Sequence, residues 1–166
     1  MSAIDLGQHY ALQEDGYLFI QTHQQWPLLI HNYSPKTQYE RFWNPTTLQS
    51  RGLITDQAGK IIARPFPKFF NLDEHISTIG PLPSEPFEVF EKMDGSLGIL
   101  YHFEGKPAIA TRGSFHSEQS ERANYILQKK YGHIEFDPTI TYLFEIIYPE
   151  NRIVVQYGDR EDLVLL

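Results

Sequence analysis

Glu91-Lys92-Met93-Asp94-Gly95-Ser96-Leu97-Gly98 is the stretch that decides how the 166-residue chain is interpreted. The simplest interpretation is two strands joined by an Asp-Gly turn: residues 87–91 predict a strand that ends at Lys92, and residues 97–103 predict the next strand. In that case Lys92 is an exposed charge at the edge of a sheet. A lysine amine that has lost its proton can also attack a phosphorus atom, and a neighbouring glycine lets a ligand approach the backbone closely. The stretch is therefore a candidate nucleophile beside a tight turn.

Working outward, most of the chain reads as short strands separated by turn residues. Runs of β-branched and aromatic residues bounded by Gly, Pro, Asn and Asp are typical of strands. The turns Asp56-Gln57-Ala58-Gly59 and Glu104-Gly105-Lys106 each predict a hairpin. The predicted strands cover residues 28–33, 52–55, 60–66, 87–91, 97–103, 108–111, 140–148, 152–157 and 163–166.

Two segments predict helices. The stronger one runs from Ser117 to Tyr131, with Ser117 as the N-cap and Ala123, Ile126 and Leu127 as an apolar stripe. In this helix Glu118 is spaced to pair with Arg122. The weaker helix covers residues 6–15. Together with the strands, these helices predict an α+β fold built on antiparallel sheet.

Composition and charge exclude several classes of protein. The chain has no Cys, which rules out disulfides, thiol catalysis and thiolate metal sites. No apolar run approaches membrane-spanning length and the first residues lack a basic stretch before an apolar one, so we expect a cytoplasmic protein without a membrane association. The net charge is −7, with 14 basic and 21 acidic residues, which argues against a protein that coats nucleic acid.

The charge is unevenly distributed along the chain. Residues 51–68 contain four basic residues and only one acidic residue, whereas residues 69–91 contain five acids and no Lys or Arg. This gradient is explained either by unevenly solvated faces or by an anionic ligand bound to the middle of the chain. The seven His residues show no metal-ligand spacing, and neither a Walker loop nor a GxGxxG pattern is present.

Lys92-x-Asp94-Gly95 resembles motif I of the covalent nucleotidyltransferases, which comprise RNA ligases, DNA ligases and capping enzymes. Ser96-Leu97 after this motif is similar to the phage-type ATP-dependent RNA ligases that resemble RNA ligase 1. Further segments match the same family in order along residues 51–166: Arg51-Gly52, the stretch 63–71, Thr111-Arg112-Gly113-Ser114 at the motif Ia position, Tyr142-Leu143-Phe144-Glu145-Ile146 at motif III, and the continuation 149–154.

The resemblance implies a function and a set of site residues. Lys92 would attack the α-phosphate of ATP and carry a lysyl-AMP intermediate, after which AMP passes to an RNA 5′-phosphate and a 3′-hydroxyl seals the strand. Glu145 would act in catalysis and hold Mg²⁺. The other expected nucleotide-binding residues are Arg51, Lys68, Phe70, Asp94, Gly95 and Arg112. The implied cofactors and partners are ATP, Mg²⁺ and RNA ends.

The match also implies how the chain is organised. We expect residues 1–50 to pack as an N-terminal segment on a nucleotidyltransferase (adenylation) core of residues 51–166, giving effectively one domain. The family continues with a Glu-Gly-x-Val element (motif IV) and a Lys-x-Lys element (motif V), and neither occurs in this sequence. The expected adenylation domain is therefore incomplete at its C-terminal side. A bare sheet edge near Leu166 would then favour a homodimer or a partner chain that completes the sheet.

Two alternatives follow from the missing motifs. The first is a truncated, non-catalytic module that binds a nucleotide or RNA, and the second is one half of a split ligase. A purely structural β-domain is the third possibility, but it leaves the ordered series of matching segments unexplained.

Overall fold

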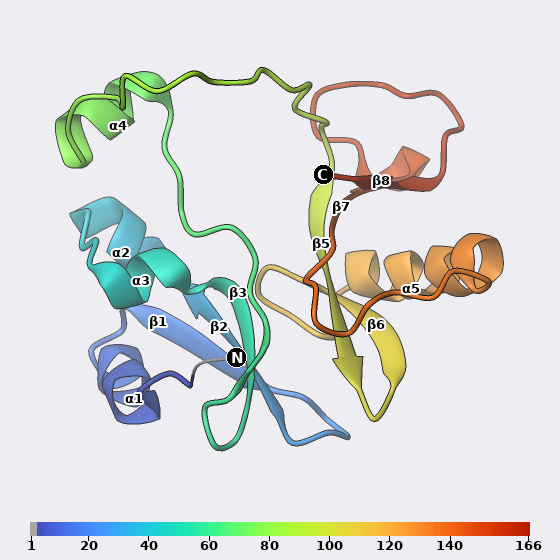
Figure 1. Cartoon of the computed structure of the whole chain (residues 1–166), viewed down its shortest axis with the longest axis horizontal. Coiled ribbons are helices and arrows are strands. Elements are labelled where there is room, and N and C mark those ends of the chain that lie inside the picture. The colour runs from blue at the N-terminus through green and yellow to red at the C-terminus, as the bar shows by residue number, and fades with distance from the viewer. Residues whose placement is uncertain (1–2) are drawn as a thin grey trace.

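Two four-stranded antiparallel sheets make up the frame of the computed structural model, which describes residues 3–166 (Figure 1). The first sheet has the order β1-β2-β3-β4, with bounds Leu18–Thr22, Leu28–Tyr33, Arg51–Asp56 and Ile61–Ala63. The second has the order β6-β5-β7-β8, where β5 is Ser96–Phe103, β6 is Lys106–Thr111, β7 is Leu143–Ile147 and β8 is Asp162–Leu165. The predicted α+β class with antiparallel sheet is confirmed.

Five α-helices and one short 3₁₀ helix are described in residues 3–166: α1 (Leu6–Glu14), α2 (Pro35–Glu40), α3 (Pro45–Gln49), α4 (Leu72–Thr78), α5 (Glu118–Tyr131) and η1 (Pro149–Asn151). Both predicted helices are present as α1 and α5. Ser117 caps α5 by accepting a hydrogen bond from the Ser120 amide, as expected. None of the helices in the described part of the chain is long and apolar enough to cross a membrane.

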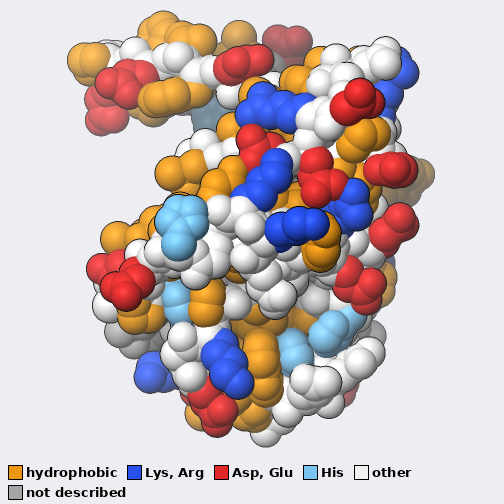
Figure 2. All heavy atoms as spheres, turned by 90° about the vertical axis from the view of Figure 1, so that its right-hand side faces the viewer, with side chains coloured by type: hydrophobic (Ala, Val, Ile, Leu, Met, Phe, Trp, Pro, Cys, Tyr) orange, Lys and Arg blue, Asp and Glu red, His pale blue; other side chains and the backbone are white. Residues whose placement is uncertain are grey.

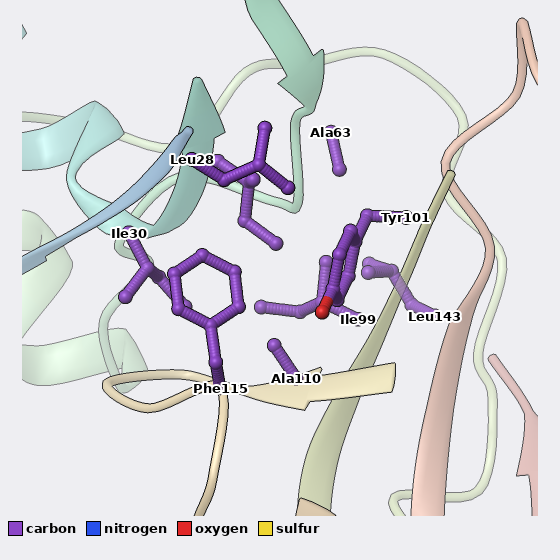
Figure 3. Close-up of a cluster of buried hydrophobic side chains, with 9 residues drawn as sticks. Leu28, Ile30, Ala63, Ile99, Tyr101, Ala110, Phe115 and Leu143 are labelled. Atoms are coloured by element: carbon purple, nitrogen blue, oxygen red, sulfur yellow. The ribbon is translucent and has the colours of Figure 1, made fainter. Parts of the chain in front are cut away.

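A shared core holds the two sheets together. Leu28, Ile30 and Ala63 of the first sheet lie against Ile99 and other apolar side chains of the second sheet, as Figure 3 shows. Gly52 allows this close approach: its φ is 87°, and a Cβ there would lie 2.4 Å from Ile99 Cδ1. A second core lies between α5 and the other face of the second sheet, where Ile126 packs with Leu100 and Ile146. The two sheets therefore share one interior.

Two predicted strands are wrong. The predicted strand 87–91 is absent, since residues 80–95 contain no strand; Phe87 and Phe90 are 86% and 79% exposed, so no neighbouring strand covers them. Residues 152–157 also form no strand. The predicted strand 60–66 is confirmed only over Ile61–Ala63, before Pro65 and Pro67.

One predicted ion pair is also wrong. Arg122 on α5 does not pair with Glu118 in the structure but with Glu161, in the segment that leads into β8. This contact ties the helix to the last strand rather than reinforcing the helix itself. The guanidinium group also lies 5.7 Å from the ring centres of both Tyr125 and Tyr148.

Two strands of the first sheet come from residues 3–50. Strands β1 and β2 belong to this region, and β2 pairs with β3 in an antiparallel register that joins Ile30 to Ile54 and Asn32 to Arg51. The division into an N-terminal segment (1–50) and a core (51–166) stays a prediction.

Candidate functional site

A cavity of about 1580 Å³ lies between the two sheets and contains five of the residues predicted from the sequence: Arg51, Lys92, Gly95, Arg112 and Glu145. Each comes from a different place in the fold. Arg51 begins β3, Arg112 directly follows β6, and Glu145 is the middle residue of β7. Lys92 and Gly95 lie in the irregular segment that leads into β5. The fold therefore gathers residues that are far apart in sequence around one hollow.

Glu145 is the half-buried carboxylate of this cavity. Its strand pairs with β5 on one side and β8 on the other, opposite Leu97 and Val164. Its Oε1 accepts a hydrogen bond of 2.9 Å from the Gly95 amide. Burial raises the pKa of Glu145, while that hydrogen bond and the positive charges of Lys92 and Arg51 act in the opposite direction. Lys92 is therefore close enough for its charge to act on Glu145.

Gly95 has a steric reason for being glycine. A Cβ on this residue would lie 2.5 Å from the backbone oxygen of Ile146 and 3.2 Å from Glu145 Cγ. A backbone oxygen cannot move aside as the end of a flexible side chain can. Only a residue without a side chain brings this turn into hydrogen-bond contact with Glu145.

Two guanidinium groups, those of Arg51 and Arg112, line the same cavity as the carboxylate. Arg112 Nη1 donates to the Tyr33 hydroxyl at 3.1 Å, and the Arg112 guanidinium lies 5.2 Å from the centre of that ring. The Arg51 guanidinium lies 4.9 Å from the ring centre of Phe69. Burial lowers the pKa of Arg51, and the nearby Arg112 adds to this effect. With Lys92, these groups give the cavity three cations; its lining also includes Glu88 and Glu91, whose side chains are exposed to solvent. Three cations in one hollow suit an anionic ligand.

Lys68 and Phe70 lie next to the cavity but do not line it. The Lys68 ammonium lies 4.3 Å from the ring centre of Phe70 and 5.7 Å from that of Trp43, and it donates to the Phe69 carbonyl oxygen at 2.8 Å. Burial lowers the pKa of Lys68, Glu74 opposes the shift, and Arg51 reinforces it. Lys68 is therefore close enough to Arg51 of the cavity for the two charges to interact, while its ammonium packs against the rings of Phe70 and Trp43.

Asp94 also lies outside the main cavity. Its Oδ2 accepts hydrogen bonds of 2.6 Å from the amides of both Val154 and Val155, and its own amide donates to the Tyr157 hydroxyl at 2.9 Å. The hydrogen bonds from the Val155 and Val154 amides hold the pKa of the Asp94 carboxyl below its usual range. Asp94 lines a separate, smaller cavity of about 230 Å³.

Several cavity residues were missed by the sequence reasoning. Aromatic side chains contribute at three positions, Phe66, Phe69 and Phe90, and polar ones at Asn32 and Gln119. Alternation in an extended chain places Phe69 on the opposite side from Lys68 and Phe70, but it does not say which side faces the cavity. Asn32 carries no sequence signal, because it reaches the cavity only through the pairing of β2 with β3.

The donor groups of the cavity suit Mg²⁺ only together with an anionic ligand such as a nucleotide. Within residues 3–166, no group of three or more His, Cys, Asp or Glu residues could hold a metal ion without help. Mg²⁺ typically binds through one or two carboxylates together with substrate phosphates and water. The half-buried carboxylate of Glu145 in a cavity that also holds three cations fits that pattern: Glu145 would hold the metal ion, and the cations would bind the phosphates of a nucleotide.

A family model described as RNA ligase matches residues 49–166 of the chain. The chain belongs to the phage-type RNA ligase family. The matched region contains every predicted site residue and all four strands of the second sheet. It also contains β3, which carries Arg51.

Three proteins whose names include RNA ligase are similar to this chain in sequence. The chain is 30% identical over 133 residues to a "Putative RNA ligase" of Thermovibrio ammonificans, covering 76% of this chain and 35% of that protein. It is 28% identical to a "Putative bifunctional polynucleotide kinase/RNA ligase" of Autographa californica nuclear polyhedrosis virus, covering 87% and 24%. It is 24% identical to an "RNA ligase" of Rhodothermus phage RM378, covering 84% and 40%. The chain therefore spans less than half the length of these relatives.

Proposed function

We propose that this member of the RNA ligase family accepts AMP from ATP on Lys92 and that the AMP is then used to join an RNA 5′-phosphate to a 3′-hydroxyl. The observation that carries the proposal is the gathering of Lys92, Arg51, Arg112 and Glu145 around one cavity. An isolated surface lysine has no such surroundings. A triphosphate needs a cationic site, and a phosphoryl-transfer reaction needs that charge near the nucleophile.

The first step is a displacement at the α-phosphorus of ATP. The Lys92 nitrogen forms a bond to that phosphorus, and the bond between the phosphorus and the pyrophosphate oxygen breaks. The amine must first lose a proton, which passes to solvent water, and the half-buried Glu145 lies close enough to interact with the charge of Lys92. Arg51 and Arg112 would stabilise the charge on the phosphate oxygens.

Magnesium held at Glu145 would neutralise charge on the phosphate oxygens during the displacement. The protein's own residues do the remaining work. Gly95 fixes the orientation of Glu145 through its amide, and Tyr33 fixes that of Arg112 through its hydroxyl. We also propose that Lys68 and Phe70 bind the nucleotide, although both lie beside the cavity and do not line it. Lys68 would reach the ligand only if its ammonium left the rings of Trp43 and Phe70.

The proposal is tested by incubating the protein with ATP labelled at the α-phosphate and with Mg²⁺, and then by denaturing gel electrophoresis. We expect label on wild-type protein and none on Lys92→Ala. Lys60→Ala is the matched control, because Lys60 is an exposed lysine outside the cavity, and it should label like the wild type.

The absence of an adduct at any pH would overturn the enzymatic proposal. It would favour a non-catalytic nucleotide- or RNA-binding module, or one half of a split ligase that needs a partner chain. Sedimentation velocity on the same sample, with and without RNA ends, would then distinguish a homodimer or an RNA complex from an isolated chain.

A further inference from the structure

Lys92 lies in a segment with little structure of its own. Residues 80–95 form neither helix nor strand, and the side chain of Lys92 is exposed. Met93, which is 8% exposed, is buried beside it. Something else must fix the position of a lysine in such a segment, because an irregular exposed chain is otherwise mobile.

The three residues that follow Met93 are each bonded to the segment 145–157. Asp94 binds the amides of Val154 and Val155 and the hydroxyl of Tyr157. Gly95 binds Glu145, and the Ser96 hydroxyl donates to Asn151 Oδ1 at 3.1 Å. Asn151 Nδ2 in turn donates to the Ile146 carbonyl oxygen at 2.9 Å. Residues 94–96, which follow Lys92 and Met93, are therefore each hydrogen-bonded to one continuous partner segment of the chain, residues 145–157.

The loop 152–157 is the least regular part of that partner. It has the apolar composition of a strand, but Ile153 and Val154 are 62% and 73% exposed. The amides of Val154 and Val155 bind a carboxylate instead of a neighbouring strand. Ile153 lines the main cavity. Asp94 thus connects the nucleophile's segment to a loop that reaches the cavity.

We propose that Tyr157 and the Val154–Val155 amides form a latch on Asp94 that positions Lys92 at the cavity. This inference rests on the proposed role of Lys92. Tyr157 is a positioning residue in this scheme, since it acts through the Asp94 backbone and lies outside the main cavity. Because a nucleophile must be aligned closely with its target, a loosened latch should slow the reaction without weakening ATP binding.

The latch itself can be tested without any enzymatic activity. Hydrogen–deuterium exchange of the Val154 and Val155 amides should be slow in the wild type and about tenfold faster in Asp94→Ala. Asp94→Asn keeps an acceptor oxygen and should retain most of the protection. Equal exchange in wild type and Asp94→Ala would overturn the latch.

Its effect on Lys92 is tested by the rate of adduct formation. We expect Tyr157→Phe to lower the rate at saturating ATP by about tenfold, with an unchanged half-saturating ATP concentration and an unchanged melting temperature. Asp94→Asn should recover most of the rate lost in Asp94→Ala. Tyr125→Phe, which removes an exposed phenol on α5, is the control and should react like the wild type.

The outcomes separate the two proposals. A wild-type rate in Tyr157→Phe, or a loss confined to ATP affinity or melting temperature, would overturn the positioning role. An absence of adduct in the wild type itself would overturn the proposed function, while the exchange measurement would still decide whether the latch exists.

Discussion

At the scale of single residues, Arg51 gives the clearest test of how the cations of the cavity contribute to the proposed reaction. Its guanidinium is half-buried and shares the cavity with Lys92 and Glu145. Removing one well-placed donor to a developing charge typically costs about a hundredfold in rate. We therefore expect Arg51→Met to lower the initial rate of adduct formation by about a hundredfold.

The matched control for Arg51→Met is Arg64→Met. Arg64 is an exposed arginine of the same segment, and its guanidinium donates to Gln49 rather than facing the cavity. It should leave the rate within about twofold of the wild type, since exposed charges away from a site contribute little. Equal losses in the two variants would show that the segment's total charge matters and not the position of Arg51.

Gly95 gives a stability prediction at the same scale. Gly95→Ala would force a methyl group against the Ile146 carbonyl oxygen, and such overpacking typically costs about 1–3 kcal/mol. Urea denaturation should show this loss. Gly113→Ala is the comparison, because the nearest atom to a Cβ there is Asn32 Nδ2 at 3.5 Å, and it should change the free energy of unfolding by less than about 0.5 kcal/mol.

At the scale of elements, the N-cap residue Ser117 stabilises α5. Ser117 accepts from the Ser120 amide at 3.1 Å and its hydroxyl also contacts that of Thr111. Ser117→Ala should lower the free energy of unfolding by about 1 kcal/mol. Ser117→Asp keeps an acceptor for the amide and should lose less than the alanine variant in the same denaturation experiment. A larger loss in the aspartate variant would contradict the capping explanation.

The elements that the sequence predicted correctly are those with local signals. Helix α5 has a cap and an apolar stripe, and the hairpin around Asp56–Gly59 has turn chemistry in which Asp56 Oδ1 accepts from Ala58 and Lys60. The two strands predicted wrongly, residues 87–91 and 152–157, had only their content of β-branched and aromatic residues as a signal. Composition does not say whether a partner strand is within reach, and here the partner of Val154 and Val155 is a side chain, Asp94.

The same distinction applies to the candidate site. The resemblance to the RNA ligase motifs pointed to Lys92, Arg51, Arg112 and Glu145, and the structure brings them to one cavity. It could not predict that Phe69 rather than Phe70 lines that cavity, because the choice depends on which way an extended segment faces. The roles of all these residues stay predictions.

At the scale of the whole molecule, charge is arranged locally rather than overall. The chain carries a net charge of −7, and on the face seen in Figure 2 acidic and basic side chains are interspersed. The cavity between the sheets nevertheless brings three cations together with the half-buried carboxylate of Glu145, while the other two acids of its lining, Glu88 and Glu91, are exposed. An acidic protein can therefore still offer a site for an anion, provided that two sheets and the segment before β5 meet around it.

A buried histidine pair makes the stability of the whole fold depend on pH. His31 is fully buried, its Nε2 contacts Thr55 Oγ1 at 3.0 Å, and its Nδ1 lies 3.2 Å from Nδ1 of His9 on α1. Burial lowers the pKa of His31 to about 3, with a further contribution from His9. Burial also lowers the pKa of His9, against the opposing charge of Asp5.

The sign of the pH effect follows from that shift. The unfolded chain takes up a proton at His31 below about pH 6.5 while the folded chain does not, so acid favours unfolding. The free energy of unfolding should fall by about 2 kcal/mol from this residue between pH 7.5 and pH 5. In His31→Gln the decline over that range should be shallower by a similar amount, and an unchanged slope would contradict the assignment.

The most direct test of the account as a whole is to locate the nucleotide on the protein. After incubation with ATP and Mg²⁺, the protein would be digested and its peptides analysed by tandem mass spectrometry. We predict an adenylate bound through the side-chain nitrogen of Lys92 and no adenylate on any other lysine. An adenylate on a different lysine, or unmodified Lys92 at every pH and ATP concentration tried, would contradict the account.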